Sequence, residues 1–423
     1  MSAVPSQRVS APPPVSTGIV LSGGGARGAY EAGVVAGIME VLRPRRAPFD
    51  VLCGTSVGAL NAAYLASHAH LPDMNAAGLI SQWQALELNR HLKLDMRGVL
   101  GWKRTFSADE PVFPSPTSTG PSYAGRSLLH TGAIDELVEQ AVKWDKLHQN
   151  VQSGLVRALI VAALHISSGK TTLFAEMTPA VEFKSGRDPR RTPFVGPIAA
   201  EHVLASAAIP LLFPARRVGS DYYCDGGLRY NTPIAPAIRA GAQRLVVISL
   251  LSDSPDSVGD APLEQRLQAY RSPIFLVGKL LNALLLDPLN YDLQILDRFN
   301  RLLETLEHAL TPEEMRRVQH VLEESRGLAY RKVETLVFRP SRDIGRMARE
   351  RAKSIKSSMF SSWFLARTAT LGALWESDLT SFILFDQEFA RELVQLGRSD
   401  TLRRADEIRR FFGKSLFRVS VPP

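Results

Sequence analysis

The sequence has few residues of the kinds that build disulfides and metal sites. Only two cysteines occur among its 423 residues, Cys53 and Cys224, and each lies inside an apolar stretch. A disulfide framework or a cysteine zinc site is therefore not expected, which fits a reducing compartment. We expect neither a metal nor a cofactor.

The sequence also lacks an apolar run long enough to cross a bilayer. The longest run, IFLVGKLLNALLL at 274–286, includes Lys279 and falls short of the roughly 20 residues that a spanning helix needs. Residues 1–16 contain no apolar signal segment and are rich in proline and serine, which predicts a disordered leader. We therefore expect a cytoplasmic protein, soluble or peripheral to a membrane, although a signal-independent secretion route would leave no trace.

No strong excess of one charge singles out a class of partner. The net charge of +8 arises from 50 basic and 42 acidic residues spread along the chain, which mildly favours anionic surfaces. Nucleic-acid binding is not predicted. The basic stretch at 339–367 carries Phe360, Trp363 and Phe364 and could lie on anionic lipid, although a solvated basic helix is the commoner structure.

Strands alternate with helices along the first part of the chain, which predicts an α/β fold with a largely parallel sheet. The expected strands are 17–22, 51–53, 155–166, 171–176, 221–224 and 244–250, and the expected helices include 26–42, 134–147 and 201–208. Residues 101–126 are rich in proline, serine, threonine and glycine, which predicts a long loop or a flap that could cover a site. From 253 onward the pattern is mainly helical, with one strand expected at 333–338 that could join the same sheet.

The strongest motif is Gly54-Thr55-Ser56-Val57-Gly58, a G-x-S-x-G turn between a predicted strand and a predicted helix. Small residues at both ends let the chain turn tightly enough to expose a serine hydroxyl, and the helix N-terminus stabilises nearby negative charge. Ser56 is therefore the candidate nucleophile. The alternative, a glycine-rich turn with an incidental serine, is less common when both flanks fit.

A serine nucleophile needs a base, and the usual chain order places a histidine last. Only His308 and His320 follow a plausible acid here, and both lie in highly charged helical segments. A triad in another order stays open through the earlier histidines, which are His68, His70, His91, His130, His148, His165 and His202. The best acid is Asp225, because two glycines follow it and would let its carboxylate approach another backbone closely. It could act as the base directly, or Asp-Gly-Gly could be merely a turn.

The stretch LSGGGARGAY allows three interpretations. Gly23, Gly25 and Gly28 satisfy the dinucleotide pattern G-x-G-x-x-G, but Asp50 comes before the second strand rather than at its end. A P-loop would need Lys and Ser or Thr after Gly28, and Ala and Tyr stand there. The third interpretation is an oxyanion hole, because successive glycine N–H groups at a helix N-terminus can donate to a developing negative charge.

Together, SGGGARG at 22–28, GTSVG at 54–58, ASAAIPLLFPA at 205–215 and DGG at 225–227 resemble the patatin-like phospholipase family in kind and order. The resemblance covers about residues 17–250 and departs from many members at Ser22, where an aspartate is common. It is less specific in the segments VETLVFRPSRDIG and LTSFILFDQEFARELVQLG. It implies a three-layer α/β/α sandwich, with a catalytic domain at 17–252 and a mainly helical extension at 253–423.

The resemblance also implies calcium-independent hydrolysis of lipid acyl esters by a Ser-Asp dyad. Ser56 would be the nucleophile and Asp225 the general base, on a turn completed by Gly226 and Gly227. The oxyanion hole would form from Gly23, Gly24, Gly25 and Gly28, with Arg27 close by. The alternative is a lipid-binding or scaffolding protein on a catalytically silent core. The sequence does not specify which acyl ester is cleaved, the positional preference, activators or the oligomeric state.

Overall fold

The computed structural model describes residues 15–86, 93–94, 123–124, 129–130, 132–179, 181, 188–210, 212–252, 263–264, 267, 279, 282–283, 288–326, 331–355 and 379–413. Residues 1–14 of the expected leader at 1–16 lie outside the described residues. Nearly all of the expected flap at 101–126 lies outside them as well. The aromatic end of the basic stretch at 339–367 also lies outside them. Within the described part of the chain, every helix is too short or too polar to cross a bilayer.

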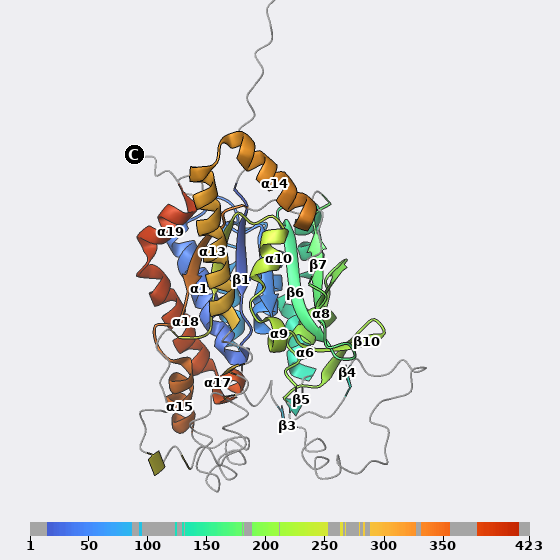
Figure 1. Cartoon of the computed structure of the whole chain (residues 1–423). Coiled ribbons are helices and arrows are strands. Elements are labelled where there is room, and N and C mark those ends of the chain that lie inside the picture. The colour runs from blue at the N-terminus through green and yellow to red at the C-terminus, as the bar shows by residue number, and fades with distance from the viewer. Residues whose placement is uncertain are drawn as a thin grey trace, which may run out of the picture.

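A sheet forms the centre of the fold (Figure 1). Its strands lie in the order β12 (Glu334–Phe338), β11 (Arg244–Ile248), β1 (Thr17–Leu21), β2 (Val51–Thr55), β6 (Ala158–His165), β10 (Asp221–Asp225), β9 (Ala215–Val218) and β4 (Tyr123–Ala124). β7 (Thr171–Met177) pairs with β6 and with β8 (Arg191–Val195). From β12 to β6 every pairing is parallel. The expectation of an α/β fold with a mostly parallel sheet is confirmed.

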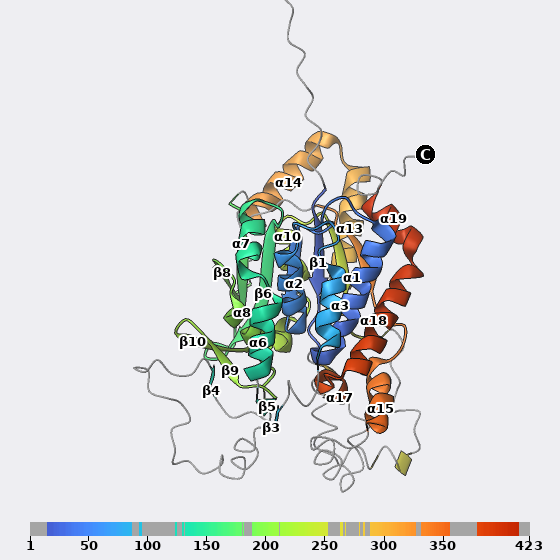
Figure 2. The same cartoon turned by 180° about the vertical axis from the view of Figure 1, so that it is seen from behind.

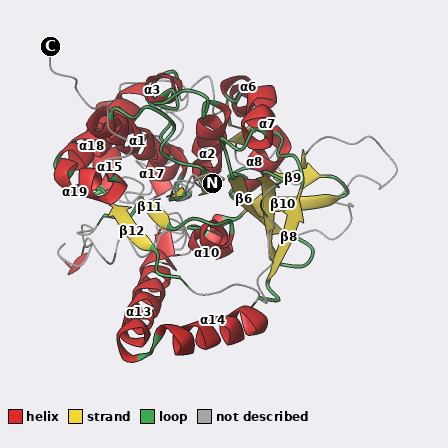
Figure 3. Cartoon of the chain, turned by 90° about the horizontal axis from the view of Figure 1, so that it is seen from above, coloured by secondary structure: helices red, strands yellow, loops and turns green. Residues whose placement is uncertain are grey.

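Helices cover both faces of this sheet, as the view from above shows (Figure 3). Alternate residues of β1 separate the two faces: Ile19 and Leu21 belong to one apolar cluster and Val20 to the other. Strands buried on both faces explain why the sequence reads as short continuous apolar runs rather than alternating ones. The first face carries α1 (Ala29–Leu42), α2 (Val57–Ser67), α7 (Trp144–Gln152) and α18 (Gln387–Leu402), and the second carries α10 (Ile234–Arg239) and α13 (Pro288–Ala309).

The remaining described elements are short connectors and peripheral helices, several of which are visible from behind (Figure 2). They are the 3₁₀ helix η1 (Gly25–Gly28), α3 (Ala76–Gln84), α6 (Gly132–Ala141), α8 (Ala200–Ser206), α9 (Gly227–Tyr230), α14 (Pro312–Arg326), α15 (Ile344–Ser354), α17 (Leu379–Ile383), α19 (Ala405–Phe412), and the pair β3 (Lys93–Leu94) and β5 (Leu129–His130).

One expected element differs from the structure. The single helix expected at 134–147 is two helices, α6 and α7, because Lys143 leaves the helical region at φ −83° and ψ 82°. The break lets α7 turn its own apolar residues, Leu147 and Val151, into the core. β8, β9 and α3 were not expected from the sequence, whereas the strand expected at 333–338 is present and pairs with β11.

The C-terminal helix α18 packs closely along α1, and glycines make this approach possible. A Cβ atom added to Gly33 would lie 2.2 Å from the carbonyl oxygen of Val394, and one added to Gly397 would lie 2.3 Å from that of Tyr30. Gly37 faces Thr401 in the same way, at 2.7 Å. The C-terminal helix is therefore part of the core structure of the fold.

Replacing Gly33 by Ala should destabilise the protein. Helix propensity alone would favour alanine by about 1 kcal/mol, but a methyl group against the Val394 backbone forces the helices apart at a cost of about 1–3 kcal/mol. Chemical denaturation of Gly33→Ala and of the control Glu40→Ala, an exposed position on the same helix, would test this. Glu40→Ala removes only a surface ion pair with Arg398, so a loss of stability as large as that of Gly33→Ala would contradict the argument.

Candidate active site

The register of β6 brings Ser56 and Asp225 together. At the end of β2, Thr55 pairs with Ala162, and at the end of β10, Asp225 pairs with Ala163. Since β7 pairs with the opposite edge of β6, β2 and β10 must share one edge and meet end to end. The residue after Thr55 and the last residue of β10 therefore lie side by side, although they are far apart in the sequence.

Ser56 stands on a strained turn between β2 and α2. Its backbone has φ 55° and ψ −127°, outside the regions that non-glycine residues usually adopt. The two glycines of the motif make the turn possible: a Cβ on Gly54 would lie 2.2 Å from the Gly58 carbonyl oxygen, and one on Gly58 would lie 2.3 Å from that of Leu21. This is the geometry expected of a nucleophile elbow.

Asp225 is fully buried and held from one side. Its Oδ1 accepts a hydrogen bond of 2.7 Å from the N–H of Gly227. A Cβ on Gly226 would lie 2.2 Å from the Ala162 carbonyl oxygen, so only glycine allows this turn to approach β6 so closely.

The other carboxylate oxygen of Asp225 has no regular hydrogen bond, and the Ser56 side chain lies close to the carboxyl group. Burial raises the pKa of Asp225 to about 7, against the opposing effect of hydrogen bonding from the Ser56 side chain and the Gly227 N–H. Oδ2 is buried and has no partner of normal hydrogen-bond geometry among the described residues. The Ser56 hydroxyl thus lies beside the carboxyl without a fully formed hydrogen bond. A carboxyl group with this pKa can exchange a proton near neutral pH.

Ser206, at the end of α8, joins the elbow to β6. Its hydroxyl accepts a hydrogen bond of 2.8 Å from the Ser56 N–H and donates one of 2.6 Å to the Ala162 carbonyl oxygen. Two residues later, the Ala208 carbonyl accepts from the Asp225 N–H at 2.9 Å. The role of Ser206 was not predicted, although the run ASAAIPLLFPA that contains it was recognised.

The glycine-rich loop lies between β1 and α1, and its N–H groups are not equivalent. The Gly23 N–H donates to Asn231 Oδ1 at 2.9 Å, so it is already engaged. The N–H groups of Gly24 and Gly25 have no hydrogen-bond partner among the described residues. Ser22 ties the same loop to the sheet, because its hydroxyl donates to the Ile248 carbonyl oxygen at 2.8 Å.

Arg27 of the same loop is held by the C-terminal part of the chain. Arg27 is 3% exposed, its Nε donates to Ser381 Oγ at 2.8 Å, and its guanidinium carbon lies 4.4 Å from the centre of the Phe382 ring. A Cβ on Gly25, which has φ 58°, would lie 2.1 Å from the Phe382 carbonyl oxygen. Helix α17 therefore packs directly on the glycine-rich loop. Nothing in the sequence around 379–383 predicted this contact.

Within the described part of the chain, no histidine hydrogen bonds to Ser56 or Asp225. His68 contacts the Tyr64 carbonyl, His148 contacts Glu176, His165 contacts Asp221 and Ser168, His202 accepts from the Ala199 N–H, and His70, His308 and His320 are exposed. His91 and the side chain of His130 lie outside the described residues. The open alternative of a triad in another chain order finds no support among the histidines that the structure describes.

The two cysteines are free, buried thiols, Cys53 on β2 and Cys224 on β10. Burial raises the pKa of Cys224 to about 12 and that of Cys53 further, so neither thiol is a nucleophile near neutral pH. The described residues also contain no group of His, Cys, Asp and Glu side chains that could hold a metal ion.

Known proteins are similar to this chain in sequence. The sequence profile of the family described as patatin-like phospholipase matches residues 19–238. A curated relative, the cGAMP-activated phospholipase of Pseudomonas aeruginosa (strain BWHPSA011 / Pa011), is 27% identical over 279 residues, which cover 61% of this chain and 69% of the relative. The crystal structure of VipD from Legionella pneumophila matches with 18% identity and a TM-score of 0.31, over 64% of this chain and 56% of the VipD chain. This chain therefore spans a little over half of that solved structure.

The family profile extends from the first strand of the sheet through Ser56 and Asp225 to α10, and so covers just over half of the chain. The chain belongs to the patatin-like phospholipase family.

Proposed function

We propose that the protein hydrolyses carboxylic esters of lipids with Ser56 as nucleophile and Asp225 as general base, without calcium. Membership of the family supports lipid acyl hydrolase activity in general. The observation that carries the finer proposal is the meeting of β2 and β10 on one edge of β6, which sets a strained, buried serine beside a carboxyl group with a pKa of about 7.

The proposed reaction has two stages. Ser56 Oγ attacks the ester carbonyl carbon while Asp225 Oδ2 takes the hydroxyl proton, and the carbonyl oxygen becomes an oxyanion. The tetrahedral intermediate collapses, the alcohol leaves with the proton from Asp225, and the acyl group stays on Ser56. Water then attacks this acyl-enzyme and gives a proton to Asp225. Asp225 passes this proton to Ser56 Oγ as the bond between Oγ and the acyl carbon breaks, so the fatty acid is released and both residues are restored.

The glycine-rich loop is proposed to stabilise the oxyanion. The N–H groups of Gly24 and Gly25 are its best candidate donors, since neither has a partner among the described residues. The N–H of Gly23 is bound to Asn231, so we assign this glycine to holding the loop in place. Arg27 contributes positive charge to the loop while remaining fixed to α17. Phospholipids and lysophospholipids are the proposed substrates.

Labelling with a fluorophosphonate probe would test the nucleophile. We expect the wild-type protein to be labelled at Ser56 and to hydrolyse acyl esters equally well with and without a calcium chelator, whereas Ser56→Ala should lose both labelling and hydrolysis. Ser67→Ala is the matched control, because Ser67 is a buried serine at the other end of α2 that bonds only to its own helix turn and to His68. A wild-type protein that resists labelling would instead favour a catalytically silent lipid-binding core.

The rate of hydrolysis should depend on the protonation of Asp225. Because the carboxylate form is the base, we expect kcat/KM to rise with pH through about 7 and then level off. Asp225→Asn should lose about 10²- to 10⁴-fold in rate. Initial rates between pH 5 and pH 9 would measure this, and a profile that is flat across neutral pH would contradict the assignment.

The same substitution should stabilise the folded protein at high pH. The pKa of Asp225 is raised on folding, so the folded state prefers the protonated form and loses stability as pH rises from about 4 through about 7. Asparagine does not ionise, so the variant does not lose stability in this way as pH rises. The melting temperature of Asp225→Asn should therefore exceed that of wild type by more at pH 8 than at pH 5. A variant that is less stable at pH 8 would contradict the sign of this effect.

Ser206 is proposed as a positioning residue for the elbow. Ser206→Ala leaves the Ser56 N–H and the Ala162 carbonyl without their partner, which should cost about 1–3 kcal/mol of stability. A displaced nucleophile should also lower kcat by about 10- to 100-fold with a smaller change in KM. Ser67→Ala again serves as the control for loss of a buried hydroxyl. Equal kinetic effects in Ser206→Ala and Ser67→Ala would contradict a positioning role for Ser206.

A further inference from the structure

Glu31 carries a fully buried carboxyl group that the proposed reaction does not use. It lies in the first turn of α1, three residues after Gly28 of the glycine-rich loop. Burial raises the pKa of Glu31 well above its ordinary value, against the weaker opposing effects of hydrogen bonding from Asn61 and from the nearby Ser22 N–H. Its Oε1 has no regular hydrogen-bond partner among the described residues. Because a buried charge with so few partners is costly, the neutral, protonated carboxyl is the form that the fold favours.

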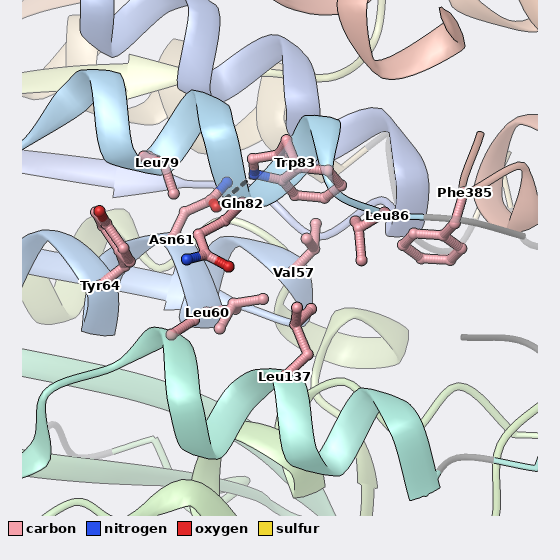
Figure 4. Close-up of a pocket in the computed structure, with 11 residues that line it drawn as sticks. Val57, Leu60, Asn61, Tyr64, Leu79, Gln82, Trp83, Leu86, Leu137 and Phe385 are labelled. Atoms are coloured by element: carbon pink, nitrogen blue, oxygen red, sulfur yellow. Dashed lines mark hydrogen bonds between the residues drawn. The ribbon is translucent and has the colours of Figure 1, made fainter. Parts of the chain in front are cut away.

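Asn61 of α2 connects this carboxyl group to the glycine-rich loop. Its Nδ2 donates to Glu31 Oε2 at 2.8 Å and to the Gly28 carbonyl oxygen at 3.2 Å. Its Oδ1 accepts from Trp83 Nε1 of α3 at 3.0 Å (Figure 4). An indole nitrogen can only donate, so the amide oxygen must face Trp83 and the amide nitrogen must face the other two groups. Three partners therefore fix the orientation of the Asn61 amide.

Two asparagine side chains thus hold the glycine-rich loop at its two ends. Asn231 binds both polar groups of Gly23, because its Oδ1 accepts from the N–H at 2.9 Å and its Nδ2 donates to the carbonyl oxygen at 3.2 Å. Asn61 binds Gly28 at the other end. The N–H groups proposed to stabilise the oxyanion lie between these two anchors.

The two anchors belong to the segments that carry the proposed nucleophile and base. Asn61 is part of α2, which begins directly after Ser56. Asn231 directly follows α9, which begins in the turn after Asp225. The position of the loop is therefore set relative to both groups of the proposed dyad.

The loop also packs directly against the nucleophile turn. A Cβ on Gly23 would lie 2.9 Å from the Ser56 Cβ, and one on Gly28 would lie 2.7 Å from the Val57 side chain. A shift of the loop would therefore change the distance between its N–H groups and the atoms that react at Ser56. Misplacement of a catalytic group by about 1 Å can cost about 10²-fold in rate.

We propose that Glu31 and Asn61 form a positioning pair, which holds the glycine-rich loop against α2 so that its N–H groups meet the oxyanion formed at Ser56. The proposal rests on the proposed function, since it assigns residues that support the same reaction. Neither residue needs to touch the substrate: Glu31 orients the Asn61 amide, and Asn61 holds the Gly28 carbonyl. Because the oxyanion forms only after the substrate has bound, loss of the pair should lower kcat more than it changes KM.

Replacing Asn61 by leucine would test the hold on the loop. Asn61→Leu removes the amide at nearly constant volume and should lower kcat by about 10- to 100-fold with a smaller change in KM. Asn150→Leu is the matched control, because Asn150 is a buried asparagine on α7 whose Nδ2 donates at 2.8 Å to the Ala66 carbonyl oxygen, near the far end of α2. This control should lose stability and keep the wild-type kcat.

Steady-state kinetics on a p-nitrophenyl ester would measure both constants, and circular dichroism melts would show which variants are folded at the assay temperature. Equal losses of kcat in folded Asn61→Leu and Asn150→Leu would overturn the proposal. So would a folded Asn61→Leu protein with the wild-type kcat.

Substitutions of Glu31 give a second test, which does not require Asn61→Leu to fold. Glu31→Leu leaves the Asn61 Nδ2 without its closest acceptor and should lower kcat about tenfold. Glu31→Gln should restore most of this loss, because glutamine resembles the protonated carboxyl in shape and charge and its carbonyl oxygen can accept from Asn61. A Glu31→Gln protein as slow as Glu31→Leu would contradict the role of a neutral acceptor, and a Glu31→Leu protein with the wild-type kcat would contradict the pair.

Amide hydrogen exchange of segment 22–28 separates this proposal from the proposed reaction. Measured by mass spectrometry, exchange in this segment should be faster in Asn61→Leu and Glu31→Leu than in wild type, and unchanged in Asn150→Leu. If the wild-type protein hydrolysed no ester while exchange changed in this way, the reaction would be wrong and the positioning of the loop right. If esters were hydrolysed while kcat and loop exchange were the same in all three variants as in wild type, the positioning pair would be wrong and the reaction right.

Discussion

The arrangement of the site depends on one pairing register, that of β6 at Ala162 and Ala163. β2 runs parallel to β6 and ends opposite Ala162, while β10 approaches antiparallel along the same edge and ends opposite Ala163. The Ala162 carbonyl oxygen also receives the Ser206 hydroxyl and lies against Gly226. A shift of one residue in either pairing would carry Ser56 or Asp225 to another position and turn its side chain to the opposite face of the sheet.

The conformation of Ser56 and the burial of Asp225 lower the stability of the folded protein, and contacts with the surrounding core offset this loss. Ser56 holds a strained backbone conformation, and Asp225 is a carboxyl group buried where its charge is costly. Both are fixed by backbone contacts that only glycine permits and by hydrogen bonds from buried groups. Strain and a raised pKa are features that functional sites share, because they favour reactivity over stability.

The local parts of this site could be predicted from sequence pattern, whereas the pairing of Ser56 with Asp225 was expected only through the family resemblance. Strand-to-helix junctions at Ser56 and at the glycine loop follow from local pattern, as does the α/β class. The register that joins Asp225 to Ser56 depends on two strand pairings, Thr55 with Ala162 and Ala163 with Asp225, which span 107 and 62 positions of the chain. The local pattern of a single sequence carries no signal for them. The same limit applies to Ser206 and to α17, whose side chains act on residues remote in sequence, and to the break at Lys143, where tertiary packing overrides a helical pattern.

The contact of α17 with the glycine-rich loop bears on the order in which the parts of the candidate site can assemble during synthesis. Ser56 and Asp225 both belong to the first 225 residues, but Gly25 and Arg27 pack against Ser381 and Phe382. Ribosomes release the chain from its N-terminus onward, so Gly25 and Arg27 lack these partners until residues 379–383 have emerged. A nascent chain cut short before residue 379 would thus carry Ser56 and Asp225 beside a loop that is tied to Ile248 and Asn231 but lacks its contact with α17.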